Sequence, residues 1–338
     1  METNWRAEAP KEWQALLRAD EGAVPSHQPT IALALAQVVP GMSAQWVCVE
    51  REGTLIGGAP VLIERRAGAE WLHAMPMMLS GAPLASAGEH ANVDAAIATA
   101  FSERVRQGGY VGGSWSCFRP SGERVTDRAL ERIAGETRWV EAAVLPLEGG
   151  VDAVLRRIDR KSRQALQHTL ARGLHFGEEP DALEEAYALH LAQRTQWGAA
   201  RALPLELARR LLGGDAPAAR LFTVRDGRGL LSASLALDSD RETFLWWSGT
   251  HRDGRRSHAF SRLVWGVVEW AAERNRSRVD LGASTGLSLV ADFKRSLGAE
   301  SVRYPVRWFA AGRTTGLTAV IASLQGWVRR SRPRGERA

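Results

Sequence analysis

Residues 221–237 read LFTVRDGRGLLSASLAL, with two apolar runs on either side of Asp226-Gly227. Apolar runs joined by such a pair are typical of a β-hairpin. Residues 46–63, WVCVEREGTLIGGAPVLI, repeat the arrangement around an Arg-Glu-Gly turn. An internal repeat determines the architecture of a whole chain. The two hairpins therefore predict a duplicated unit.

The elements that follow each hairpin keep the same order. After the first hairpin we predict a strand over 69–86, a helix over 92–107, a strand over 110–118, a helix over 123–134 and a strand over 138–147. After the second we predict a strand over 242–249, a helix over 257–274, a strand over 278–281, a helix over 287–297 and a strand over 301–309. This alternation indicates an α/β fold. The matched order favours duplication over two unrelated α/β stretches.

A chain of 338 residues is long enough for two domains. We predict an N-terminal domain over 1–147 and a C-terminal domain over 148–310, with the boundary at Glu148-Gly149-Gly150. The second domain opens with a helical insertion over 150–215, in which helices are predicted at 151–171, 181–196 and 204–212. Residues 311–338 are predicted as an amphipathic helix and a basic tail.

Composition excludes several classes of protein. With 45% hydrophobic and 24% charged residues the chain is globular, and disordered or fibrous classes are excluded. Cys48 and Cys117 are too few for a disulfide framework, and no spacing typical of a metal site is present. The N-terminus resembles no export signal, and apolar stretches are too short to span a bilayer. We expect a cytoplasmic protein without a metal.

The net charge of +6 is concentrated in two segments. Residues 151–175 carry six basic and two acidic side chains, and the tail from Gly326 carries five arginines and one glutamate. Because the basicity is local, we expect no DNA-binding face. The whole chain has only three lysines, Lys11, Lys161 and Lys294, so each lysine is more informative than an arginine.

Residues 282–286 form a G-x-S-x-G motif around Ser284, between a predicted strand and a predicted helix. In a hydrolase this motif carries the nucleophile, and a histidine must follow it in the chain. The last histidine is His258, which precedes the motif. We therefore interpret the glycines as a tight turn into a helix N-terminus, whose N–H groups suit an anion.

Several short motifs resemble those of one family. In the last third they are Asp280-Leu281-Gly282, Gly286-Leu287, Phe293-Lys294 and Leu297-Gly298-Ala299. Earlier they are Lys161-Ser162-Arg163, Leu166, Arg172-Gly173-Leu174, Trp265 and Trp270-Ala271. These residues resemble the FemAB-like proteins, including the BioF2-like acetyltransferases, of the GNAT superfamily. The resemblance covers about residues 45–310 and implies two tandem GNAT-like domains with mixed sheets flanked by helices.

The resemblance implies transfer of an acyl group to an amine. The donor would lie between two splayed strands, 244–249 and 279–282, where backbone N–H groups stabilise an oxyanion. Asp280 is the nearby carboxylate that would remove the proton of the acceptor. Lys294, the neighbour of Phe293 in the sequence, would contact the charged donor or the transition state. The alternatives are a capping role for Asp280, a solvated Lys294 and a core position for Phe293.

Arg163 and Trp247 are further candidates for binding substrate, together with Ser284 and Arg256. Arg156, Arg160 and Arg163 follow i, i+4, i+7 spacing on a predicted helix and so share one face, and such a row suits phosphate. The alternative is a solvated helix face. Trp247 suits stacking on the donor or a sugar, and core packing is the alternative.

The identity of the donor is open between two classes. Acyl-CoA is the usual donor in this superfamily, but Arg255-Arg256-Ser257-His258-Ala259 lacks the glycines of the pyrophosphate loop. An aminoacyl-tRNA is the donor of the peptidoglycan-bridge enzymes, although residues 150–215 lack the long helical arm that those enzymes commonly carry. The acceptor would be an amine of a small molecule or glycan precursor, of the cell envelope or of a polysaccharide.

A different class of function is a non-catalytic binding protein on the same scaffold, which the missing glycines favour.

Apolar residues recur at helical spacing over 316–328, before the five arginines. This pattern is compatible with peripheral contact to an anionic membrane surface. The alternative for the pattern is packing of the apolar stripe on the first domain, with the basic tail left free.

Overall fold

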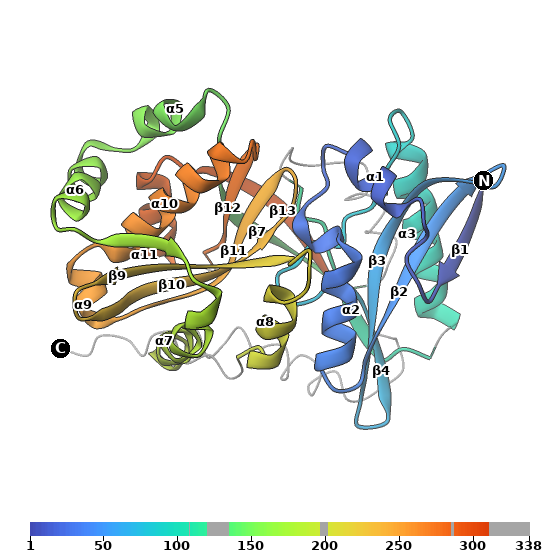
Figure 1. Cartoon of the computed structure of the whole chain (residues 1–338). Coiled ribbons are helices and arrows are strands. Elements are labelled where there is room, and N and C mark those ends of the chain that lie inside the picture. Colours follow the sequence, from blue (N-terminus) through green and yellow to red (C-terminus); the bar gives the residue numbers. More distant parts are fainter. Residues whose placement is uncertain (108, 120–134, 197–201, 285–286, 311–338) are drawn as a thin grey trace. The chain divides into compact units, whose positions relative to one another are not determined.

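The structure is a computed structural model of the chain, in which residues 1–107, 109–119, 135–196, 202–284 and 287–310 are described (Figure 1). Two compact units are present. Unit 1 contains Met1–Val144, Asp280–Asp292 and the strand that starts at Glu300. Unit 2 contains Leu145–Val279 and Phe293–Ala299. The fold is mixed α/β, as the repeat predicted, with a mixed sheet flanked by helices, as the resemblance implied.

Unit 1 is built around one sheet. Its elements are β1 (Glu2–Arg6), α1 (Trp13–Ala19), η1 (Pro25–His27), α2 (Pro29–Val38), β2 (Met42–Arg51), β3 (Thr54–Arg66), β4 (Ala69–Ala74), β5 (Leu84–Ala85), α3 (His90–Gln107), β6 (Gly112–Ser116), β7 (Glu136–Pro146) and, from the end of the described chain, β13 (Glu300–Ala310). The strand order is β1-β2-β3-β4-β6-β13-β7. Strands β4 and β6 are parallel, and α3 provides the crossover that parallel neighbours require.

The core of unit 1 lies between the sheet and α3. Phe101 of α3 packs against Trp115 of β6, with ring centroids 4.5 Å apart. It also meets Phe309 of β13 edge to face at 5.6 Å. All three rings are buried. The period-2 alternation of each strand places these apolar side chains on the face that α3 covers.

Strand β13 comes from the second copy of the repeat but pairs within unit 1. It is antiparallel to β6, with Val306 opposite Ser116. It is also antiparallel to β7, with Val306 opposite Arg138. The last strand of the second copy therefore lies between two strands of the first.

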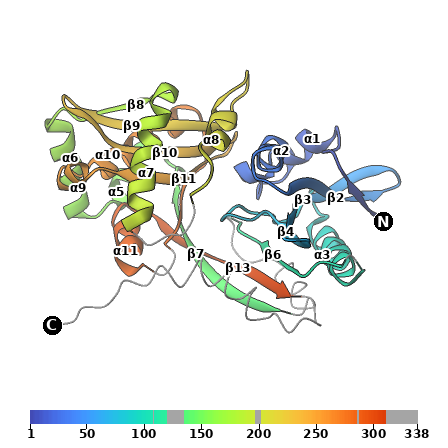
Figure 2. The same cartoon turned by 90° about the horizontal axis from the view of Figure 1, so that it is seen from below.

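Unit 2 is a second layered body. Its elements are α5 (Gly150–Arg157), α6 (Arg160–Ala171), β8 (His175–Glu178), η2 (Pro180–Ala182), α7 (Leu183–Gln196), α8 (Leu205–Leu212), β9 (Ala219–Asp226), β10 (Gly229–Asp238), β11 (Glu242–Thr250), α9 (Arg252–Arg256) and α10 (Ala259–Glu273). Strands β8, β9, β10 and β11 form an antiparallel meander. Helix α10 packs on one side of it and α7 on the other (Figures 1 and 2). Strand β12 (Arg278–Ala283) and helix α11 (Ser288–Ser296) follow α10.

Helix α10 approaches β8 closely because residue 266 is glycine. A Cβ atom on Gly266 would lie 2.3 Å from the ring of Phe176, a distance that real contacts do not reach. The ring of Phe176 in turn stacks on Phe222 of β9 at 5.6 Å. Ten residues of α10 are buried, as expected for a helix that covers a sheet.

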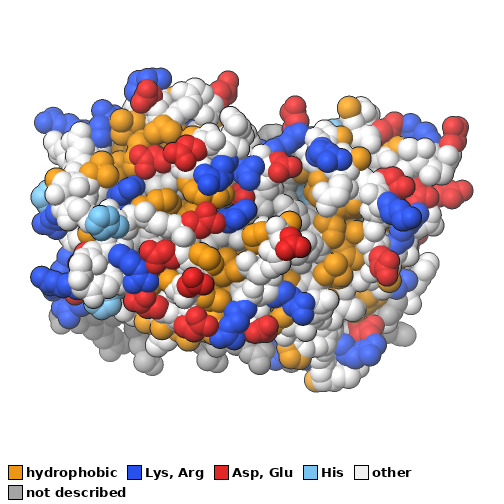
Figure 3. Space-filling model, in the orientation of Figure 1, with side chains coloured by type: hydrophobic (Ala, Val, Ile, Leu, Met, Phe, Trp, Pro, Cys, Tyr) orange, Lys and Arg blue, Asp and Glu red, His pale blue; other side chains and the backbone are white. Residues whose placement is uncertain are grey.

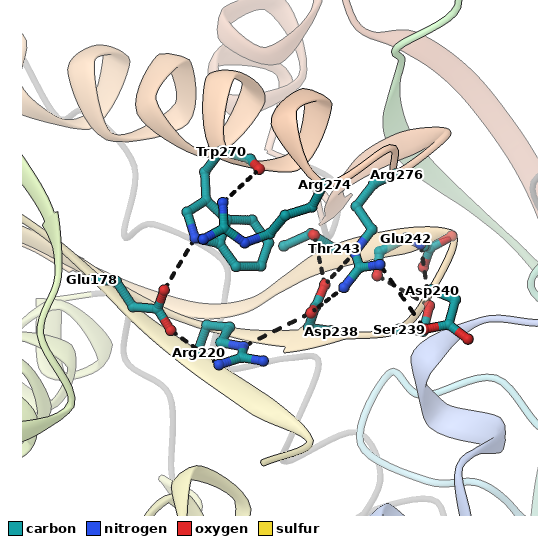
Figure 4. A network of polar contacts seen from close by, with 10 residues as sticks. All are labelled: Glu178, Arg220, Asp238, Ser239, Asp240, Glu242, Thr243, Trp270, Arg274 and Arg276. Atoms are coloured by element: carbon teal, nitrogen blue, oxygen red, sulfur yellow. Dashed lines mark hydrogen bonds and ion pairs between the residues drawn. The ribbon is translucent and has the colours of Figure 1, made fainter. Parts of the chain in front are cut away.

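A network of polar contacts joins the C-terminal end of α10 to the sheet (Figure 4). Asp238 accepts two hydrogen bonds from Arg276, at 3.2 Å from Nε and 2.9 Å from Nη2. Glu178 accepts a hydrogen bond from Trp270 Nε1 at 3.0 Å and another from Arg220 at 3.2 Å. Because Asp238 and Trp270 are buried, these paired contacts stabilise the packing of α10.

Two predictions of secondary structure were wrong. The helix expected over 151–171 is divided into α5 and α6, because Ile158 is extended and Asp159 caps α6 by accepting a hydrogen bond from Ser162 N at 2.6 Å. The strand expected over 69–86 ends at Ala74, and the chain then turns with positive φ at Met75, Met77 and Met78. The predicted helices at 123–134 and 316–328 lie outside the described residues.

In the described ranges no helix has the length and apolarity needed to cross a membrane. Within the same ranges no group of three or more His, Cys, Asp or Glu side chains is arranged for a metal ion. Cys48 and Cys117 are both buried thiols.

Candidate functional site

Asp280 lies in β12, and its carboxylate shapes the turn that follows. The side chain is 4% exposed. Its Oδ1 atom accepts a hydrogen bond from Gly282 N at 2.7 Å. Gly282 has φ 73°, a conformation that favours glycine. The Asp280-Leu281-Gly282 motif is therefore a turn in which the acid caps the backbone, one of the two roles anticipated for Asp280.

Within unit 1, Tyr304 of β13 lies near enough to Asp280 to be affected by its charge. Its side chain is buried, and its ring lies edge to face with Phe118 at 5.2 Å. Burial raises the pKa of the Tyr304 phenol, and the negative charge of Asp280 raises it further. The phenol therefore stays protonated at neutral pH and remains a hydrogen-bond donor.

Lys294 lies on α11 and is 6% exposed. This burial excludes the alternative of a solvated surface lysine. A lysine is rarely buried to this extent unless its charge is paired or hydrogen-bonded. Phe293, the residue before it, is half-buried and lies 5.9 Å from the ring of Phe260 on α10. The Phe-Lys pair is thus packed into the fold.

The last turn of α11 is fixed to α6 by two contacts. Ser162 Oγ donates to Ser296 Oγ at 2.8 Å, and Asp159 N donates to Ser296 O at 3.0 Å. Gly298 then ends the helix with φ 84°, where a Cβ atom would lie 2.9 Å from Arg157 Cβ. These contacts explain why glycine occupies the Leu297-Gly298-Ala299 motif and hold Lys294 in one place.

Arg163 does not share a helix with Arg156. Its Nη2 atom donates to the carbonyl oxygen of Ile158 at 3.0 Å and to that of Arg156 at 3.3 Å. It thereby caps the C-terminal carbonyls of α5. The prediction that three arginines share one helix face is therefore wrong, because the helix is broken at Ile158. A direct contact of Arg163 with substrate stays a prediction.

Trp247 lies in β11 and is buried against α7. Its ring is 4.7 Å from His190 and 6.3 Å from Tyr187. His190 Nδ1 lies 3.0 Å from the carbonyl oxygen of Ser248. Burial lowers the pKa of His190 to about 4, so this ring is neutral at pH 7. Stacking of Trp247 on a ligand stays a prediction, beside the core packing that is observed.

The segment where a pyrophosphate loop was considered is the short helix α9. Its turns use backbone N–H groups internally: Arg255 N donates to His251 O at 3.1 Å and Ser257 N to Asp253 O at 3.0 Å. The Arg256 side chain is 69% exposed and lies 3.9 Å from Asp253. These N–H groups already have partners, so they are not available to surround phosphate oxygens.

Ser284 precedes α11 and is 9% exposed. Its carbonyl oxygen accepts a hydrogen bond from Leu287 N at 2.9 Å. The other two residues of its motif, 285 and 286, lie outside the described part of the chain. A role of Ser284 in binding substrate stays a prediction.

In unit 1 the segment that contains Gly81 fills the space beyond the ends of the parallel strands β4 and β6. The β4–β6 register ends at Ala74 opposite Trp115. Gly81 then donates its N–H to Ser116 O at 2.9 Å, and Gly81 O accepts from Trp115 Nε1 at 3.1 Å. A Cβ atom on Gly81 would lie 2.5 Å from the carbonyl carbon of Ala74. Main chain therefore fills the space beside the ends of β4 and β6.

Sequence reasoning missed several residues that shape these surroundings. Ser296 and Tyr304 are common residue types without a motif, and only the fold shows that they adjoin Ser162 and Asp280. His190 gave no signal either, because a histidine in a helical pattern is indistinguishable from a surface residue. Gly81 follows a run of methionines that looks like a strand.

Residues 153–295 match the model of the acetyltransferase (GNAT) domain family. A comparison with curated protein sequences finds no match.

Solved structures share the fold at low identity. The structure of FemX has a TM-score of 0.71 and 11% identity, covering 96% of this chain and 100% of that one. A C-terminal domain of a putative lysylphosphatidylglycerol synthetase from Agrobacterium fabrum has a TM-score of 0.56 and 14% identity, covering 93% and 95%. A tandem GNAT protein from the clavulanic acid biosynthesis pathway has a TM-score of 0.53 and 14% identity, covering 93% and 100%.

The fold and the matched domain define an N-acyltransferase. The matched range is a GNAT acetyltransferase domain, and the fold is shared with FemX and with a tandem GNAT protein, which agrees with the resemblance found in the sequence. Asp280 and Lys294 both lie inside the matched range, 153–295.

Proposed function

We propose that this N-acyltransferase moves an acyl group to an amine of a cell-envelope or polysaccharide precursor, with Lys294 and Asp280 as its catalytic residues. The observation that carries the proposal is the burial of Lys294, 6% exposed, on a helix fixed at its last turn. A lysine charge is rarely buried to this extent unless it is paired or hydrogen-bonded. Such charges are concentrated at functional sites.

The reaction joins the acceptor nitrogen to the acyl carbon and breaks the ester or thioester bond of the donor. The ammonium of the acceptor must first lose a proton, and Asp280 is the group assigned to receive it. Negative charge then develops on the acyl oxygen, where the ammonium of Lys294 is assigned to stabilise it. The leaving oxygen or sulfur finally takes up a proton.

The donor is assigned to unit 2. Gly81 supports this assignment, because main chain fills the corresponding position of unit 1. Strands β11 and β12 are neighbours in the sheet and would provide the two strands beside the donor. Residues 1–147 would then contribute structure and contacts to the acceptor.

An aminoacyl ester is the second candidate for the donor. Helix α9 favours it, since its N–H groups bond within the helix and are not arranged around a pyrophosphate. The fold shared with FemX supports the same candidate. An aminoacyl-tRNA presents an ester at its 3′ end and needs no pyrophosphate loop.

Replacement of Lys294 tests the proposal. Lys294→Met keeps the aliphatic stem and removes the charge, so turnover should fall about 10²- to 10³-fold with little loss of fold. Acetyl-CoA and aminoacyl-tRNA would be offered as donors to UDP-linked amino sugars and muropeptides, with products read by mass spectrometry. Lys11→Met, at an exposed lysine of unit 1, is the matched control and should keep full activity.

Asp280→Asn separates the two roles of Asp280. The amide oxygen still accepts from Gly282 N, so the turn is retained while the base is lost. If Lys294→Met and Asp280→Asn each reduce turnover by less than about tenfold, or about 1.4 kcal/mol, the assignment fails. An absence of product with every donor would favour the non-catalytic alternative.

A further inference from the structure

Unit 2 presents a strongly basic surface that does not include Lys294 or Asp280. Residues 160–177 contain four arginine or lysine residues, two histidines and no acid. Helix α9 adds further basic side chains. We define the basic face by its exposed residues: Arg160, Lys161, His168, Arg172, Arg252 and Arg256.

Both segments lie at the same end of unit 2. Figures 1 and 2 agree in placing α6 and α9 at that end, and α10 contacts both of them. Figure 3 shows basic and histidine side chains gathered at this end, on the left, with few acidic ones among them. Asp253 is a nearby acid, 3.9 Å from Arg256.

One large apolar side chain is exposed beside these charges. Leu170, near the end of α6, is 51% exposed. No aromatic side chain of α6 or α9 is among the exposed large hydrophobics of the described chain. Single-stranded nucleic acids are bound by exposed aromatic rings on which bases stack. Basic side chains with an exposed leucine are instead typical of a membrane-surface helix.

We infer that the basic face binds the surface of a bilayer that contains anionic phospholipid. Lysine and arginine beside such a bilayer are attracted by its negative potential, and each removed contact lowers partitioning about fivefold. Leu170 would enter the headgroup region. The inference concerns where the enzyme works and does not depend on Lys294 or Asp280, since vesicle binding is measured without turnover.

The test uses the full chain and vesicles of phosphatidylcholine with or without about one third phosphatidylglycerol, the range in which anionic surface potential develops. Arg160→Glu with Lys161→Glu reverses two charges in the first turn of α6. Glutamate is favourable at a helix N-terminus, so the helix is retained. Arg66→Glu with Arg106→Glu, at exposed positions of unit 1, makes the same change in net charge and is the control.

We expect the wild type and the control to sediment with anionic vesicles at low salt and not with neutral ones. The α6 double variant should bind at least tenfold more weakly. Equal loss in both double variants, or no loss in the α6 variant, would assign binding to overall charge or to the basic tail and overturn the inference. Failure to bind anionic vesicles, with binding to RNA instead, would overturn it as well.

Discussion

Ser162 Oγ donates a hydrogen bond to Ser296 Oγ at 2.8 Å, although 134 positions separate the two residues. The first turn of α6 is thereby joined to the last turn of α11, two residues beyond Lys294. The Lys161-Ser162-Arg163 and Phe293-Lys294 motifs, which looked independent in the sequence, are parts of one arrangement.

This contact predicts coupling between Ser162 and Ser296. Ser162→Ala and Ser296→Ala should each lower the free energy of unfolding by about 1 kcal/mol. The double variant should be less destabilised than the sum of the two, by about 0.5 kcal/mol or more. Denaturant unfolding of the four proteins measures the coupling, and strict additivity would show that the two hydroxyls do not interact.

Gly81 should tolerate no side chain. Gly81→Val places a Cβ atom against Ala74, whose carbonyl carbon would be 2.5 Å away, so unit 1 should lose about 2 kcal/mol or more of stability. Gly227→Ala is the matched control, because nothing lies within 4 Å of its Cβ position. Thermal unfolding would show a lowered Tm for the first variant and little change for the second. A stable Gly81→Val protein would mean that this main chain moves aside.

Asp238 should contribute far more to stability than Asp240, although both face Arg276. The Asp238 side chain is 5% exposed and lies 2.9 Å from Arg276, whereas that of Asp240 is 91% exposed at 4.0 Å. Asp238→Ala removes the buried partner of the half-buried Arg276 guanidinium and should cost about 3 kcal/mol. Asp240→Ala should cost less than about 1 kcal/mol. Similar midpoints in urea for the two variants would contradict the burial argument.

His27 should make the protein sensitive to acid. Burial lowers the pKa of His27 from 6.5 to about 4. Between these values the unfolded chain binds a proton that the folded chain does not, so the free energy of unfolding falls as the pH falls. The loss should reach about 3 kcal/mol by pH 4. His27→Gln should flatten this dependence, and His190, whose pKa is also lowered to about 4, should account for part of the remainder.

Acetyl-CoA should bind weakly, because the N–H groups of α9 bond within the helix. Calorimetric titration of the full chain is the measurement. We expect a Kd well above 1 μM, the value that corresponds to about −8 kcal/mol. Tighter binding would show that other groups of unit 2 hold the pyrophosphate, and it would remove the argument for an aminoacyl ester.

The order of elements could be predicted from the sequence because hairpins and amphipathic helices are local patterns. The hairpin around Asp226-Gly227 is an example, and β9 and β10 have the expected turn between them. The break between α5 and α6 also had a local signal, since Asp159 is a good N-cap residue. The prediction of a single helix relied on residue spacing alone, and it therefore placed three arginines wrongly on one helix face.

The surroundings of the candidate site could be predicted only in part. Lys294 was identified by a motif and by the rarity of lysine, but its burial depends on contacts between segments far apart in the sequence. No local sequence pattern indicates that the main chain at Gly81 fills the space beyond β4 and β6. Its position depends on how these two strands lie in the folded sheet. Such contacts are set by tertiary packing, which periodicity does not encode.

The position of β13 has a consequence for biosynthesis. Strand β6 is translated long before Val306, which must lie opposite Ser116 to complete the sheet of unit 1. Until the ribosome has released residue 310, the nascent chain therefore exposes β6 as an open edge. Open edges recruit other strands. The protein accordingly cannot complete its first unit before β13 has been made, and we expect its newly made chains to depend on chaperones more than those of an enzyme built from two contiguous domains.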